Sequence, residues 1–172
     1  YEIIYVEKGD GDCLLVDSII SYSKGDLILF GSELPHSMQS PPDGGEESDN
    51  EEKSELKVRG VNIQFEKDFM HYSISQYSQF IPIRNLLEDA CRGIKFTITR
   101  SGKIIKLLKQ IPSAKGVDQI ILLLSLLQMM ATSNHRKYLT TSHYTPSPSI
   151  MRNERMEKVI ACLLYTSPSP RD

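Results

Sequence analysis

The stretch GDLILF at residues 25–30, closed by ELPH at residues 33–36, gives the clearest indication of the fold. Upstream, YEIIYV at residues 1–6 leads into the turn GDG at residues 9–11, and a second apolar run, CLLV, follows at residues 13–16. Short runs of β-branched, aliphatic and aromatic residues separated by Gly-Asp turns indicate consecutive antiparallel strands. Glycine suits these turns because it adopts a positive φ without a clash from a Cβ.

An acidic segment separates these strands from the next one. Residues 41–55 contain almost no apolar side chains, so burial cannot repay their ordering entropy, and we expect a mobile loop there. An acidic site for a partner is the less favoured alternative. Polar and apolar side chains then alternate in VNIQF at residues 61–65, which is the period of a half-buried strand.

After residue 78 the apolar residues no longer alternate as in a strand but recur at the spacing of a helix. Apolar side chains at helical spacing predict helices near residues 80–92, 102–111 and 116–132. A short apolar segment at residues 94–98 predicts a further strand between the first two helices. The chain is therefore expected to be an α+β protein, with an antiparallel β-barrel or sandwich followed by helices.

Composition limits the classes of function. The chain has 172 residues, which is enough for one good core. Its net charge of -2 gives no basic face for nucleic acid. Cys13 and Cys91 form no disulfide framework and no CxxC motif, so a cytoplasmic location is expected. The most apolar run, residues 120–131, would span only ~18 Å as a helix, against ~30 Å of hydrocarbon, so we expect no membrane span.

The strand pattern resembles the small β-barrel of the cupin superfamily, and more narrowly the N-terminal effector-sensing domain of AraC-type transcription regulators. The residues that carry this resemblance are YEIIYV at 1–6 with Gly9 and Gly11, GDLIL at 25–29, and Pro35-His36. It extends over most of the chain, up to about residue 161.

The resemblance implies an order of segments along the chain. Residues 1–75 would form a cupin-like barrel that is truncated at its N-terminal side, and residues 76–143 would form a helical dimerisation region. Residues 144–150 would be a linker, and residues 151–161 would begin a helix-turn-helix domain whose remainder is missing. The last segment, residues 162–172, looks like translated sequencing-adapter DNA, and we expect it to carry no chemistry.

The same resemblance implies a small-molecule effector inside the barrel, with a sugar as one candidate, and DNA bound through the missing domain. We predict Tyr5, His36 and Gln64 as pocket residues. For His36, an ordinary histidine at a strand end is an equally good interpretation. No cofactor is expected.

The alternative function is a stand-alone metal-dependent cupin enzyme, such as an isomerase or dioxygenase. Such enzymes use two histidines one residue apart, a glutamate and a later histidine. His36 resembles the later histidine and Glu2 lies near the glutamate, but the sequence has no His-x-His pair. We therefore favour the regulator, and the linker and the restarted helix support that choice.

The helix expected at residues 116–132 is apolar on several sides. Ile120, Leu123, Leu124, Leu127 and Met130 form one stripe that we expect to face the core. The other apolar side chains of this helix point in other directions, and among them we predict Leu122, Leu126 and Met129 as contacts of a homodimer. A helix buried wholly within its own domain is the open alternative.

Overall fold

The computed structural model describes residues 1–39, 58–98 and 102–141, and within them the chain is an α+β structure with two antiparallel sheets. The larger sheet has five strands in the order β6 (Arg59–Gln64), β1 (Glu2–Lys8), β4 (Asp26–Phe30), β7 (Ile94–Thr97) and β8 (Arg136–Tyr138). The smaller sheet has three strands in the order β3 (Ile19–Ser23), β2 (Asp10–Leu15) and β5 (His36–Gln39). The prediction of an α+β fold with antiparallel strands is confirmed.

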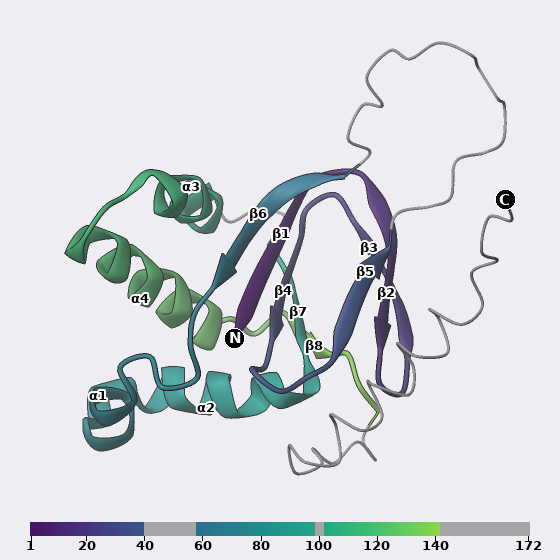
Figure 1. Ribbon diagram of the computed structural model, residues 1–172. Helices are drawn as coiled ribbons and strands as arrows, with labels where there is room; N and C mark the ends of the chain where they lie inside the picture. Colours follow the sequence, from purple (N-terminus) through teal and green to yellow (C-terminus); the bar gives the residue numbers. More distant parts are fainter. Residues whose placement is uncertain (40–57, 99–101, 142–172) are drawn as a thin grey trace, which may run out of the picture.

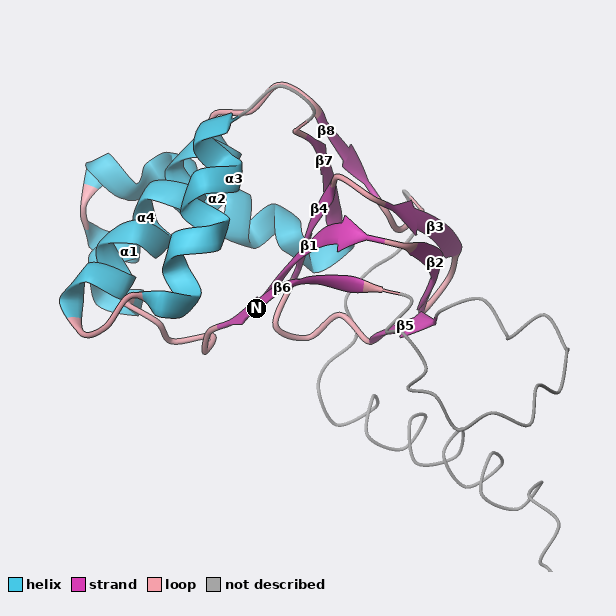
Figure 2. Cartoon of the chain, turned by 90° about the horizontal axis from the view of Figure 1, so that it is seen from above, coloured by secondary structure: helices cyan, strands magenta, loops and turns pink. Residues whose placement is uncertain are grey.

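The chain passes repeatedly between the two sheets, which stand face to face (Figures 1 and 2). No strand of the described residues is paired with both sheets, so the two sheets form an open sandwich and do not close into a barrel. A small apolar core fills the space between them. Its buried members are Val6, Cys13, Tyr22, Ile28, Phe30, Leu34 and Leu139.

Helices cover the other face of the five-stranded sheet (Figure 2). They are α1 (His71–Gln76), α2 (Ile81–Asp89), α3 (Gly102–Gln110) and α4 (Val117–Ala131), with 3₁₀ turns at Ser78–Phe80, Ala90–Arg92 and Ile111–Ser113. The larger core lies between these helices and the sheet. The described part therefore has three layers: helices, five-stranded sheet and three-stranded sheet.

Strand β1 contributes side chains to the cores on both of its faces. Successive side chains of a strand point to opposite faces, so Ile3 and Tyr5 join the core under the helices, while Ile4 and Val6 join the core between the sheets. Because both faces are covered, apolar residues occupy both sets of positions. Glu2 shares the inter-sheet face with Ile4 and Val6.

Two glycines allow close turns around β4. Gly25, between β3 and β4, has a φ of 94°, a conformation that side chains with a Cβ rarely adopt. Gly31, just after β4, lies so near the 3₁₀ turn following α2 that a Cβ would be 2.8 Å from the Ala90 carbonyl oxygen. Its own N–H donates to that oxygen. This contact fixes the start of the loop that leads to His36.

The helices expected near residues 80–92, 102–111 and 116–132 correspond closely to α2, α3 and α4, and β7 occupies the segment expected as a strand. Sequence reasoning missed α1 and β8. Strands β7 and β8 lie within residues 76–143, yet both belong to the larger sheet, because β7 pairs with β4 and β8 pairs with β7. The acidic segment from residue 41 to 55 and residues 144–150, 151–161 and 162–172 lie outside the described residues. Among the helices that are described, none has both the length and the apolar character needed to cross a membrane.

Candidate functional site

Glu2 is the centre of a polar cluster at one end of the sandwich. Strand pairing places Glu2 opposite Gln64 of β6 and opposite Phe30 of β4. Because residues two apart share a face of a strand, Asn62 also points to the side on which Glu2 lies. The register thus gathers Glu2 and two amide side chains on the face that looks toward the three-stranded sheet.

His36 reaches this cluster from the other sheet, as the first residue of β5. Its ring stacks on Phe30, with 3.8 Å between ring centroids and 10° between ring planes. The ring nitrogen Nδ1 lies 2.9 Å from the Leu34 carbonyl oxygen, and Nε2 lies 2.8 Å from Glu2 Oε2. The imidazole therefore packs on an aromatic ring with one face, and each of its nitrogens lies within hydrogen-bonding distance of an oxygen.

The other oxygen of Glu2 accepts two amide hydrogen bonds. Asn62 Nδ2 donates to Glu2 Oε1 at 2.6 Å and Gln64 Nε2 donates to the same oxygen at 3.2 Å. The side chains of His36 and Glu2 are 17% and 19% exposed, so the pair is largely removed from water. Three strands of two sheets thus converge on one carboxylate.

These contacts determine the charge of Glu2. Burial acts to raise the pKa of the carboxyl group, but hydrogen bonds from Gln64 and Asn62 and the neighbouring His36 outweigh it and lower the pKa below the ordinary value of 4.5. Hydrogen bonds to the ionised form have this effect because protonation removes an acceptor. Glu2 is therefore a carboxylate at neutral pH.

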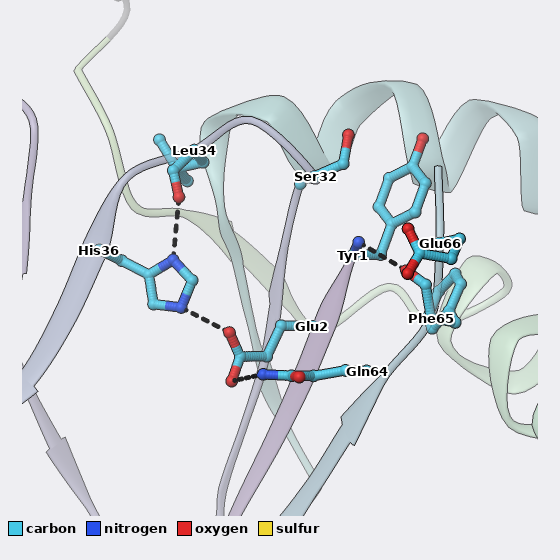
Figure 3. A pocket seen from close by; sticks show the side chains of 9 residues that line it. Tyr1, Glu2, Ser32, Leu34, His36, Gln64, Phe65 and Glu66 are labelled. Atoms are coloured by element: carbon cyan, nitrogen blue, oxygen red, sulfur yellow. Dashed lines mark hydrogen bonds and ion pairs between the residues drawn. The ribbon is translucent and has the colours of Figure 1, made fainter. Parts of the chain in front are cut away.

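A pocket of about 360 Å³ opens beside this cluster (Figure 3). It lies between the start of β1, the loop after β4 and the end of β6, and Glu2, His36 and Gln64 line it. Tyr1 and Phe65 stack at its other side with 5.2 Å between ring centroids. Polar groups on one side and aromatic rings on the other are the usual make-up of a site for a small polar molecule.

The structure brings two of the three predicted pocket residues together. His36 and Gln64 both contact Glu2 and line the pocket. Tyr5 lies elsewhere, since its side chain is buried under the helices on the opposite face of β1. Odd-numbered residues of β1, such as Tyr5, face the helices, whereas even-numbered residues, such as Glu2, face the other sheet.

Sequence reasoning singled out Glu2 only as a partial match to a metal motif and did not select Asn62. The alternation in residues 61–65 was the available signal for Asn62, because it places Asn62 and Gln64 on one face. What was missing was the register that sets β6 beside β1. Among the described residues, no third His, Cys, Asp or Glu joins Glu2 and His36 in a group that could hold a metal ion.

The residues predicted for dimerisation lie on α4. Leu126 is completely buried in the chain's own core, so the expectation that it faces outward is corrected. The reason is that α4 packs against both α2 and α3, which together cover a broader face of this helix than one layer would. Leu122 and Met129 lie partly buried at the edge of this core. Ile120, expected inside, is 39% exposed, and Ile121 is 53% exposed.

Comparison of the chain with models of known protein families, with curated proteins and with solved structures finds no match in any of the three.

Proposed function

We propose that this chain is the effector-binding and dimerisation part of an AraC-type transcription regulator. The observation that carries the proposal is the convergence of Glu2, His36 and Gln64, from three strands of two sheets, on the rim of one pocket. A small polar molecule in this pocket would contact both sheets at once. It could therefore favour one arrangement of the sheets over another, which is the requirement for signalling by a ligand.

A cupin-like sandwich of the two sheets is part of this proposal. Two antiparallel sheets facing each other around an apolar core support it, and the resemblance in the sequence points the same way. The homodimer is also part of it. The apolar side chains exposed on α4, Val117, Ile120 and Ile121, would be covered by a second copy.

Binding to the pocket can be measured directly by calorimetry. A panel of small polar compounds, containing neutral sugars such as L-arabinose and D-galactose, amines and carboxylic acids, would be titrated into the wild-type chain. At least one compound should bind, and Gln64→Ala should weaken it, because this change removes an amide at the pocket. Gln128→Ala is the matched control, since Gln128 is an exposed residue of α4 that does not line the pocket.

Two results would overturn the proposal. One is that no compound of the panel binds. The other is that Gln64→Ala and Gln128→Ala affect binding equally, because the ligand would then lie elsewhere. The DNA-binding half is tested separately by sequencing the parent gene beyond residue 161, where a helix-turn-helix pair is expected.

A further inference from the structure

The pocket beside Glu2 has an unusual balance of charge. Glu2 and Glu66 both line it, whereas none of its lining residues is a lysine or an arginine. Among the side chains that line it, only His36 can carry a positive charge. Even when His36 is protonated, the two carboxylates outweigh it, so the lining side chains present no net positive charge to an anion.

The hydrogen-bonding groups of the pocket also favour a positively charged ligand over an anion. The nitrogens of His36 face the Leu34 carbonyl and the Glu2 carboxylate, so any N–H of this ring is directed to those acceptors and not to a ligand. The amide N–H of Gln64 is likewise directed to Glu2. The acceptors that remain for a ligand are the carboxylate of Glu66, the amide oxygen of Gln64 and the second lone pair of Glu2 Oε2. The hydroxyls of Ser32 and Tyr1, which also line the pocket, can either donate or accept, and the second N–H of Gln64 can donate.

Two carboxylates and two aromatic rings surround the same pocket. Glu2 and Glu66 line it together with Tyr1 and Phe65. The rings of Tyr1 and Phe65 stack with 5.2 Å between their centroids, and the faces of aromatic rings attract cations.

We propose that the ligand of this pocket is a small organic amine that binds as its ammonium ion, with Glu2 and Glu66 as its counter-charges and the Tyr1–Phe65 pair as its aromatic wall. This inference rests on the proposed function and adds the chemical class of the effector. A volume of about 360 Å³ suits a compound of a few carbon atoms. The same site disfavours phosphorylated and carboxylated compounds, because it would place their charge beside two carboxylates.

Three compounds of equal chain length separate the possibilities. Putrescine, 1,4-butanediol and succinate carry two ammonium, two hydroxyl and two carboxylate groups on four carbons. Calorimetry at neutral pH should show putrescine binding about tenfold more tightly than the diol, because hydrogen bonds to charged groups are the stronger ones. Succinate should show no saturable binding. The affinity for putrescine should fall as salt is raised from about 0.05 M to about 0.3 M, because the rim is open to screening.

Variants locate the site. Glu66→Gln removes an exposed carboxylate of the rim and should weaken putrescine binding about fivefold, the range of exposed charge pairs. Glu2→Gln should weaken it more, and circular dichroism of this variant verifies its folding. Asp118→Asn is the matched control, since it removes an exposed carboxylate on α4 that does not line the pocket.

The outcomes are distinct for the two proposals. If a neutral sugar or the diol binds through Gln64 and putrescine does not, the amine inference is overturned while the effector-binding function stands. Binding of succinate as tight as that of putrescine also overturns it, as does equal weakening by Glu66→Gln and Asp118→Asn. If no compound of either panel binds, the effector-binding function fails and this inference fails with it.

Discussion

Replacing Glu2 tests whether its carboxylate joins the two sheets. Glu2→Leu keeps the approximate size of the side chain but leaves the donors on His36, Asn62 and Gln64 without their acceptor. Asn62 and Gln64 are exposed and can turn to water, so their contribution is small. The His36 ring is 17% exposed and cannot easily do so. An unsatisfied buried group costs about 1–3 kcal/mol, and we expect a loss of about 2 kcal/mol in the free energy of unfolding.

Glu2→Gln keeps the shape of the side chain and removes its charge, so it shows how much of the stability depends on the charge. A glutamine can accept from Asn62 and Gln64 through its oxygen and donate to Nε2 of a neutral His36 through its nitrogen. All the hydrogen bonds can therefore be kept, and the loss at neutral pH should stay below about 1 kcal/mol, the value of the lost charge assistance. Glu66→Gln is the control for removing a carboxylate from the same rim, and it should change stability by less than about 0.5 kcal/mol.

The pH dependence follows from the lowered pKa of Glu2. A carboxyl group whose pKa is lower in the folded than in the unfolded chain adds stability above its unfolded value, here 4.5, and loses it as the pH falls through the folded value. The wild type should therefore lose stability more steeply than Glu2→Gln as the pH is lowered below 4.5.

Urea denaturation followed by circular dichroism measures both effects, at pH 7 and at several values below 4.5. Two observations would refute the reasoning. Glu2→Leu could be as stable as the wild type at pH 7, or the difference between wild type and Glu2→Gln could be unchanged at low pH. In the first case the cluster does not hold the sheets, and in the second Glu2 does not titrate below its ordinary range.

Three further predictions concern the helices and DNA. Leu126→Ala should destabilise the fold by about 2–5 kcal/mol, whereas Ile121→Ala should cost about 0.5 kcal/mol or less, because Leu126 is fully buried and Ile121 is half exposed; equal midpoints in urea would contradict this. Leu122→Glu should weaken self-association in sedimentation experiments, because a charge at an apolar contact is costly, and a wild type that stays monomeric at tens of micromolar contradicts the dimer. In gel-shift experiments the chain should show no sequence preference for DNA, since its net charge is -2, and a nanomolar specific complex would be the opposing result.

The strands and helices of the described part were largely predictable because their signals are local. Gly-Asp turns mark the ends of β2, β3 and β4, and helical spacing of apolar residues marks α2, α3 and α4. The two missed elements lack such signals. Strand β8 has three residues, RKY, and two of them are exposed, so only its pairing with β7 makes it a strand. Helix α1 is short and has one buried residue, Ile74.

Local sequence patterns were sufficient to predict the α+β class, the alternation that places Asn62 and Gln64 on one face of a strand, and the apolar character of α4. Which of these residues contact one another depends on the tertiary structure. Glu2 and His36 are 34 positions apart and belong to different sheets, and their contact depends on strand register and on how the sheets face each other. Tyr5 and Leu126 illustrate the same limit. Periodicity shows which side chains share a face of a strand or helix. Which layer covers that face is set by packing between segments distant in the chain.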